Sequence, residues 1–244
     1  MLQQIQVTRD ARAMAHATTA KSCVPAACAE QCSFFSLLES KRDGGQAHGP
    51  LLKYSPRKTI YSRGDAANYC YRVVEGAVRL SRILMDGHRQ VLDLLLPGET
   101  FGMEMTAEYS ATAEAIGEVV LLRCPSACIA HQLATRNGAA SRMNAILSNG
   151  VASAQDHVAM LSHQGAIQRV ALFLLHFRET QRGPAIELPV GRQDMADYLG
   201  LTVETTCRSL TEMKNKGIIS ICGRRGIEIR NRDALEAIAE GDED

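Results

Sequence analysis

The chain has 244 residues, no net charge at pH 7, 45% hydrophobic residues, 5% aromatic residues and no Trp. This length allows two domains of ordinary size, and the composition is that of a soluble globular protein. Zero net charge argues against a protein that binds polyanions over its whole surface. The chain has no run of 18 apolar residues and no signal-peptide pattern, so we expect a cytoplasmic protein without membrane contact.

Residues 1–50 are predicted to form an N-terminal extension, which ends in the Gly-rich break "KRDGGQAHGP". It carries three of the eight cysteines of the chain, at positions Cys23, Cys28 and Cys32. In a cytoplasmic chain of this size, cysteines imply free thiols or metal ligands rather than disulfides.

Residues 51–136 are predicted to form a domain of short antiparallel strands. The strands are separated by the turn pairs Gly64-Asp65, Glu75-Gly76, Asp86-Gly87 and Pro97-Gly98. Asp86-Gly87 lies between "VRLSRILM" and "HRQVLDLLL", which is a strong hairpin signal. Several short strands at near-regular spacing indicate a barrel or sandwich.

Residues 137–164 are predicted to form one long helix. Apolar residues recur there at steps of three and four, namely Met143, Leu147, Val151, Ala154, Val158 and Leu161. This narrow stripe is typical of a coiled-coil seam. One alternative is that the helix packs on its own domain. The helix over residues 139–163 is more than three heptads long, however, which favours a homodimer formed through these residues.

Residues 165–244 are predicted to form a winged helix-turn-helix domain. In "GRQDMADYLGLTVETTCRSLTEMKNKGII", a first helix ends at Gly200, where a left-handed turn is allowed, and Thr202 caps a second helix. Thr206, Leu210 and Met213 face the core. "ISICGRRGIEIR" follows as a hairpin wing, and between residues 192 and 232 eight Lys or Arg outnumber five acids. This local basic excess fits an anion site.

The second helix presents its first turns outward, as a recognition helix does. The residues expected to contact base edges are Val203, Glu204, Cys207 and Arg208. Arg donates to guanine O6 and N7, and Glu accepts from cytosine N4. Alternatively, Glu204 and Arg208 form a surface ion pair. The residues expected to contact phosphates are Arg192, Thr202, Thr205, Arg224 and Arg225.

These segments resemble the Crp/Fnr superfamily of dimeric bacterial transcription regulators over about Tyr54 to Ala237. The motifs are "VVEGAVRL", "LPGETFG", "AEAIGEV" and "RQDMADYLGLTVETTCRSL", and "YLGLTVET" is similar to the Fnr and FixK branch. The resemblance implies an α+β chain with an N-terminal β-roll like that of cyclic-nucleotide-binding domains. It also implies a long dimerisation helix and a C-terminal winged helix-turn-helix.

In that branch, a motif E-x-x-S-R reads an inverted repeat that resembles TTGAT-N4-ATCAA. Glu204 and Arg208 match the motif, and Cys207 stands at the position of its Ser. The resemblance implies a regulator of genes for low-oxygen or nitrogen-oxide respiration, with RNA polymerase as a further partner. The chain shows no Walker loop, Rossmann fingerprint or catalytic triad order, so we do not expect an enzyme.

The resemblance also bears on the effector. Cyclic-AMP binders carry an Arg where this chain has Tyr109, and a buried cyclic phosphate without a cation is unfavourable, so cyclic AMP is not expected. Other family members hold an iron–sulfur cluster, for which the candidate ligands here are Cys23, Cys28, Cys32 and Cys124, with Cys128 as a substitute. The spacing of the N-terminal cysteines departs from the usual pattern. A haem has no clear axial ligand.

The alternative function is therefore a redox sensor, based on an iron–sulfur cluster or on thiols, whose N-terminal cysteines gate DNA binding. A second thiol hypothesis concerns Cys207. This residue lies near the N-terminus of the recognition helix and beside Arg208, where the thiolate is favoured. Oxidation to a sulfenate or sulfinate at that position would crowd the major groove.

Overall fold

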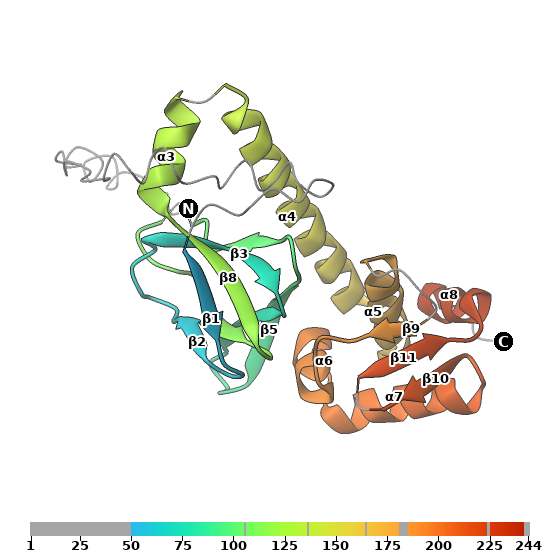
Figure 1. The fold of residues 1–244 in the computed structure, drawn as a ribbon. Coiled ribbons are helices and arrows are strands. Elements are labelled where there is room, and N and C mark those ends of the chain that lie inside the picture. The colour runs from blue at the N-terminus through green and yellow to red at the C-terminus, as the bar shows by residue number, and fades with distance from the viewer. Residues whose placement is uncertain are drawn as a thin grey trace, which may run out of the picture.

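A computed structural model describes residues 50–104, 106–135, 137–163, 165–180, 185–223 and 225–241. The predicted extension, with Cys23, Cys28 and Cys32, and the wing residue Arg224 lie outside these residues. Along the described chain, a β-roll is followed by a long helix and then by a smaller domain of helices and a hairpin (Figure 1). The order of elements agrees with the prediction.

The β-roll consists of two four-stranded antiparallel sheets, with strand orders β1-β8-β3-β6 and β2-β7-β4-β5. The strands are β1 (Leu51–Tyr54), β2 (Thr59–Tyr61), β3 (Tyr69–Glu75), β4 (Val78–Ile83), β5 (Arg89–Leu95), β6 (Thr100–Phe101), β7 (Thr112–Ala115) and β8 (Val119–Pro125). The predicted Asp86-Gly87 hairpin joins β4 to β5, and Gly87 has a φ of 82°. A positive φ is accessible to glycine without a steric penalty, so the turn residues explain the chain reversal.

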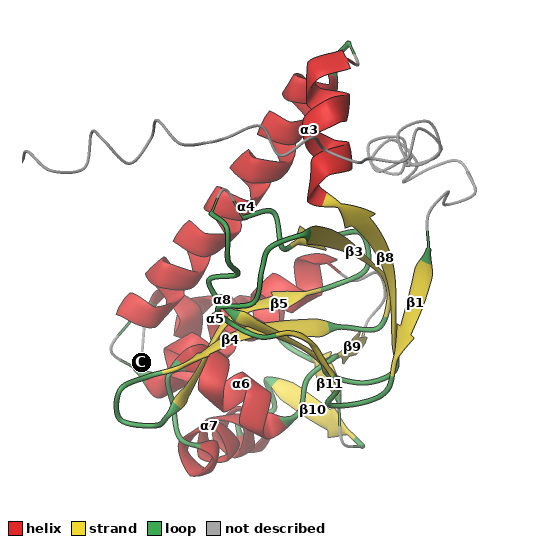
Figure 2. Ribbon diagram, turned by 90° about the vertical axis from the view of Figure 1, so that its left-hand side faces the viewer, coloured by secondary structure: helices red, strands yellow, loops and turns green. Residues whose placement is uncertain are grey.

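Two helices link the roll to the C-terminal domain. Helix α3 (Ser126–Thr135) follows β8 directly, and α4 (Ala139–Ser162) then runs along the roll towards the C-terminal domain (Figures 1 and 2). None of the helices in the described ranges has the length and apolar character needed to cross a membrane.

Helix α4 has two apolar faces with different surroundings. One face packs on the described chain through His157 and Met160, which are buried. The other carries Leu147, Val151 and Val158, which are 44%, 57% and 68% exposed. Met143 was predicted to belong to the exposed seam, but it is half-buried against α3 and the roll. From Leu147 to Val158 the seam therefore lacks a partner within the described chain, whereas Leu161, also predicted to belong to the seam, is half-buried near Gly200.

The C-terminal domain surrounds one apolar core. Its elements are α5 (Ala166–Thr180), β9 (Ala185–Glu187), α6 (Arg192–Leu199), α7 (Val203–Asn215), β10 (Ile219–Cys222), β11 (Gly226–Ile229) and α8 (Arg232–Glu240). Phe173, Leu199 and Met213 are fully buried in this core. The same cluster includes Val91 and Leu94 of the roll. The apolar core thus continues across the junction between the two domains.

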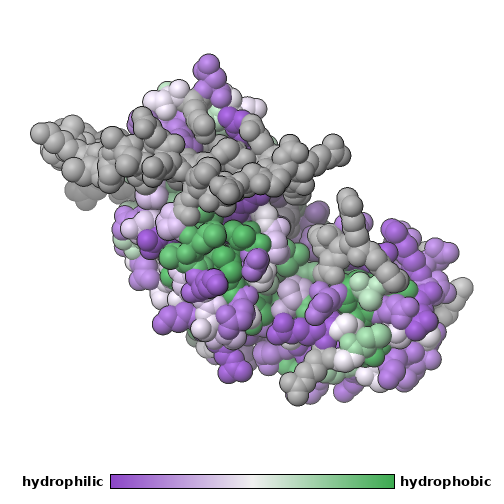
Figure 3. All heavy atoms as spheres, in the orientation of Figure 1, coloured by the Kyte–Doolittle hydropathy of each residue, from purple (hydrophilic) through white to green (hydrophobic). Residues whose placement is uncertain are grey.

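The surface differs between the two domains on the face shown in Figure 3. A hydrophobic area lies over the outer face of the sheet β1-β8-β3-β6, where Leu51 and Val74 are exposed. Hydrophilic side chains cover much of the C-terminal domain on the same face (Figure 3). In this view, the largest hydrophobic area therefore lies on the roll, where hydrophilic side chains border it.

Candidate nucleic-acid interface

The turn between α6 and α7 is built by Gly200. This residue has a φ of 62°, and its N–H donates to the carbonyl of Ala196, which closes the end of α6. Ala196 is fully buried, as are Met195 and Leu199. A left-handed residue at this position is the common way to end a helix, and glycine accepts it without a Cβ clash. The predicted end of the first helix is therefore confirmed.

Thr202 caps the second helix, as predicted. Its hydroxyl accepts a hydrogen bond from the N–H of Thr205 at 3.2 Å and lies 3.0 Å from the hydroxyl of Thr205. Glu204 lies in the first turn of α7, where the helix dipole favours a negative charge. The N-terminus of α7 is therefore defined by local side chains.

The inward face of α7 holds the helix to its domain. Thr206, Leu210 and Met213 are buried, as predicted. Ser209 is buried as well, and its hydroxyl donates to the carbonyl of Thr205 at 3.1 Å. The hydroxyl of Thr206 donates in the same way to the carbonyl of Thr202. Both buried hydroxyls are thus satisfied within the helix.

The outward face of α7 forms a shallow concave strip. Glu204, Cys207 and Arg208 are exposed, whereas Val203 is half-buried. Within the described chain no ion pair joins Glu204 to Arg208, so the alternative of a surface ion pair is not observed. The strip continues beyond the predicted residues, through Thr211, Glu212, Asn215 and Lys216. Thr211 and Glu212 follow Arg208 by three and four residues, and Asn215 and Lys216 by seven and eight, so the helical period is the sequence signal that places all four on the same face.

Arg192 lies at the first position of α6, close to this strip. Its side chain is half-buried, and this burial lowers the pKa of the guanidinium, while its electrostatic interaction with Cys207 raises it. Thr202 and Thr205 occupy the turn between α6 and the strip. The candidate phosphate contacts from α6 and α7 therefore surround the N-terminal end of the recognition helix.

The wing is an antiparallel pair of β10 and β11, and β11 also pairs with β9. Gly223 has a φ of 69° at the turn. Arg225 is exposed beside that turn and lines an open groove of about 890 Å³ with Glu118 of the roll and Glu187 of β9. One of the two predicted wing cations is thus found on the surface, while Arg224 lies outside the described residues.

Aromatic side chains fill the interior of the β-roll. Tyr109 is buried and stacks on Tyr61 with ring centroids 3.6 Å apart. Its hydroxyl donates to the carbonyl of Tyr69 at 2.5 Å. Tyr71 and Phe101 complete the cluster. The position at which cyclic-AMP binders carry a phosphate-binding Arg therefore holds a buried phenol.

Three buried thiols meet where the roll joins α3. Cys70 lies opposite Cys124 in the antiparallel pair β3-β8, and its thiol donates to the carbonyl of Cys124 at 3.4 Å. Cys128, in the first turns of α3, belongs to the same apolar cluster as Ile129. Within the described ranges, no group of three or more His, Cys, Asp or Glu could hold a metal ion. The described residues alone thus give no metal site at Cys124.

Comparisons with known proteins agree with this architecture. The profile described as "Crp-like helix-turn-helix domain" matches residues 168–238, and that described as "Cyclic nucleotide-binding domain" matches residues 51–136. The nitrogen fixation regulation protein FixK of Rhizobium meliloti (strain 1021) is 39% identical over 196 residues, which cover 78% of this chain and 88% of that protein.

Two further proteins are similar to most of this chain. The transcriptional activatory protein AadR of Rhodopseudomonas palustris is 33% identical over 193 residues, which cover 76% of this chain and 81% of that protein. The solved structure of FixK2 from Bradyrhizobium japonicum matches with a TM-score of 0.74 and 33% identity, covering 78% of this chain and 96% of the other. The chain therefore belongs to the Crp/Fnr family, a family of DNA-binding transcription regulators and not of enzymes, and within it to the FixK branch.

Proposed function

We propose that this regulator is a homodimer that binds an inverted repeat resembling TTGAT-N4-ATCAA and reads it with α7. The observation that carries this proposal is the arrangement of Glu204 and Arg208. Both are exposed, one turn apart, on a capped helix, and they form no ion pair with each other. They also match the reading motif of the Fnr and FixK branch.

The chemistry of the exposed strip fits base reading. The guanidinium of Arg208 offers a forked donor to guanine O6 and N7, and the carboxylate of Glu204 accepts from cytosine N4. Val203 and Cys207 would lie against neighbouring base edges. Arg192, Thr202, Thr205, Arg225 and Arg224 would contact phosphates, which fix the register of the protein on the duplex.

The exposed seam of α4 supports the dimer. Leu147, Val151 and Val158 follow a coiled-coil spacing and remain exposed in one chain. A two-fold axis along this seam would place one recognition helix on each half-site, so that protein symmetry matches the inverted repeat. RNA polymerase would be the further partner of such a regulator.

The functions for which related proteins are named bear on the class of target genes. Proteins named for the regulation of nitrogen fixation are 39% and 34% identical to this chain. We propose that the targets here are genes for low-oxygen or nitrogen-oxide respiration and that the regulator acts in the cytoplasm.

The proposal is tested by fluorescence anisotropy with a labelled TTGAT-N4-ATCAA duplex at a fixed salt concentration, because affinity for DNA depends steeply on salt. We expect two chains per duplex and binding about 10³-fold or more tighter than to a scrambled duplex. Equal affinity for both duplexes would contradict the proposal.

A second candidate is redox control of DNA binding by the thiol of Cys207. Cys207 is an exposed free thiol on the proposed reading face, and its electrostatic partner is the cation Arg192. An exposed thiol is accessible to oxidants, which convert it to a sulfenate or sulfinate. Oxidation would then add oxygen atoms and negative charge at the DNA surface.

Two measurements test which effector or cofactor the regulator uses. The aromatic interior around Tyr109 supports the expectation that cyclic AMP is not the effector, so adding cyclic AMP should leave operator affinity unchanged. For an iron–sulfur cluster, the ligands Cys23, Cys28 and Cys32 lie outside the described residues. A broad visible band that air bleaches in anaerobically purified protein would support the cluster. A colourless anaerobic protein that binds the repeat would exclude it.

A further inference from the structure

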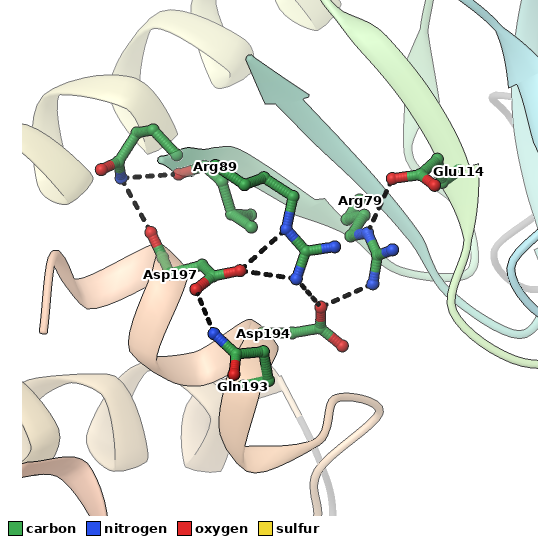
Figure 4. A network of polar contacts seen from close by, with 8 residues as sticks. Arg79, Arg89, Glu114, Gln193, Asp194 and Asp197 are labelled. Carbon is green, nitrogen blue, oxygen red and sulfur yellow. Dashed lines mark hydrogen bonds and ion pairs between the residues drawn. The ribbon is translucent and has the colours of Figure 1, made fainter. Parts of the chain in front are cut away.

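The first helix of the helix-turn-helix is joined to the β-roll by a network of ion pairs (Figure 4). Arg79 of β4 reaches Asp194 of α6, with 2.6 Å between Nη1 and Oδ1. Arg89 of β5 reaches the same carboxylate at 3.0 Å and Asp197 at 2.5 Å. Two guanidinium groups from the roll thus bind two carboxylates that lie on one side of α6.

Additional hydrogen bonds orient the charged groups of this network. Arg79 also donates from Nε to Glu114 of β7 at 3.1 Å. Asp197 accepts from the side chain of Gln193 at 2.7 Å (Figure 4). The four ion-paired side chains Arg79, Arg89, Asp194 and Asp197 are only 11–25% exposed. Charge-assisted hydrogen bonds in such a site are strongly directional, so the network favours one position of α6 on the roll.

Helix α4 enters the same junction through His157. The ring nitrogens of His157 lie 3.1 Å from the carbonyl oxygen of Leu92 on β5 and 2.8 Å from that of Tyr198 on α6. The imidazole also stacks on the Tyr198 ring, with centroids 3.8 Å apart and planes 3° apart. A single side chain of the proposed dimer helix therefore contacts the backbone of both the roll and the DNA-binding domain.

The position of α6 determines the position of α7. Only the short turn that contains Gly200 separates the two helices, and their inward residues belong to one core. Whatever fixes α6 relative to α4 therefore also fixes the recognition helix relative to the proposed two-fold axis. In a dimer, the distance between the two recognition helices decides which separation of the half-sites both helices can reach.

We infer that Arg79, Arg89, Asp194 and Asp197 are positioning residues that set the half-site spacing this regulator accepts. The inference rests on the proposed function, because it requires a dimer and an inverted repeat. Val91 and Leu94 provide apolar contact at the same junction. Apolar contact is non-directional, so the ion pairs are the part of the interface that selects one orientation.

The first test measures affinity for duplexes whose half-sites are separated by three, four, five and six base pairs. Each added base pair rotates one half-site by roughly 34° about the DNA axis. We expect wild-type protein to prefer one spacing. In Arg89→Ala, the ratio between the best and the second-best spacing should fall by roughly tenfold, which corresponds to about 1.4 kcal/mol.

Two variants make this test specific. Arg232→Ala removes an exposed ion pair with Glu236 in the same domain, and the spacing ratio should not change. Arg89→Asp combined with Asp197→Arg exchanges the two charges and should restore much of the preference, whereas Arg89→Asp alone should not. A role in general stability alone would not produce this rescue of spacing preference.

The second test needs no DNA. Hydrogen exchange is measured in Arg89–Leu95 and Arg192–Leu199 of the free protein, and Arg89→Ala should speed exchange in both segments while Arg232→Ala should not.

Wild-type protein without any preference for an inverted repeat would contradict the proposed function itself. If Arg89→Ala keeps the preference of wild-type protein for one half-site spacing, the positioning role is wrong. This conclusion holds whether hydrogen exchange in the variant becomes faster or stays the same.

Discussion

Glu204 and Arg208 lie one helical turn apart on the exposed side of α7, and within the described chain they do not form an ion pair. Opposite charges at this spacing attract each other on an isolated helix, by about 0.2–0.5 kcal/mol. That energy is small compared with a bidentate contact to a base pair. Both side chains are therefore available to an external partner at little energetic cost.

The cap of the recognition helix gives a stability prediction. Thr202→Ala removes the hydroxyl that accepts from the N–H of Thr205, and we expect it to lower the free energy of unfolding by about 1 kcal/mol. Urea unfolding followed by circular dichroism measures this change. Thr211→Ala is the matched control, because it removes an exposed hydroxyl from the middle of the same helix. A change there should stay within about 0.5 kcal/mol.

Oxidation of Cys207 gives a second prediction. Treatment with hydrogen peroxide should weaken operator binding by wild-type protein, and Cys207→Ser should resist the treatment, since the hydroxyl cannot form a sulfenate. Fluorescence anisotropy before and after treatment measures the effect. Cys222→Ser is the control, because it removes another exposed thiol in the same domain. Equal sensitivity of Cys207→Ser and wild-type protein would refute control at this residue.

The α4 seam predicts the oligomeric state. Val151→Asp places a carboxylate on the exposed seam, and dimerisation would bury it without a partner, at a cost of about 3 kcal/mol or more. We expect a dimer that dissociates at least about a hundredfold more readily, measured by analytical ultracentrifugation. Ala145→Asp adds the same charge at an exposed position roughly 160° around the helix from Leu147. If both variants remain as dimeric as the wild type, the seam is not the interface.

The buried carboxyl group of Asp93 should make the free energy of unfolding depend on pH. Burial raises the pKa of this carboxyl above 3.8, although the hydrogen bond from the Leu94 N–H and the charges of His157 and His176 lower it. A raised folded-state pKa contributes stability that is fully present below the unfolded-state value and is lost as pH rises through the folded-state pKa. At pH 7 the ionised carboxylate is therefore destabilising.

Asp93→Asn should accordingly be more stable than wild-type protein at pH 7, and the difference should decline as pH falls towards 3.8. Urea unfolding at a series of pH values measures it. Asp86→Asn, at the exposed tip of the β4-β5 hairpin, controls for the loss of a carboxylate. A stability difference that is constant over this pH range would show that ionisation of Asp93 is not its source.

Local chemistry was sufficient to predict where α6 ends and α7 begins. Gly200 ends α6 and Thr202 begins α7 through contacts between residues at most four apart, which a single sequence displays. The junction between the domains could not be predicted in this way. Arg79 and Asp194 are 115 positions apart, and nothing near either residue indicates the other. The burial of Tyr109 likewise depends on Tyr61, which only the closure of the roll brings against it.

The central claim is that Arg208 reads the G·C pair of TTGAT. Its most direct test is to measure how the Arg208→Ala substitution changes the cost of replacing that base pair. Wild-type protein, Arg208→Ala and the control Arg225→Ala are each titrated with the repeat and with a repeat whose G·C pairs are changed to A·T, at one salt concentration. Arg225→Ala should weaken binding to both duplexes alike, as the loss of a phosphate contact does.

For wild-type protein, we expect the base change to cost about 1–3 kcal/mol for each half-site. Arg208→Ala should lose little on the same change, because the side chain that reads the guanine is already absent. If Arg208→Ala instead loses as much as wild-type protein when the G·C pairs are replaced, Arg208 does not read that base pair, and the account of α7 as the reading helix is wrong.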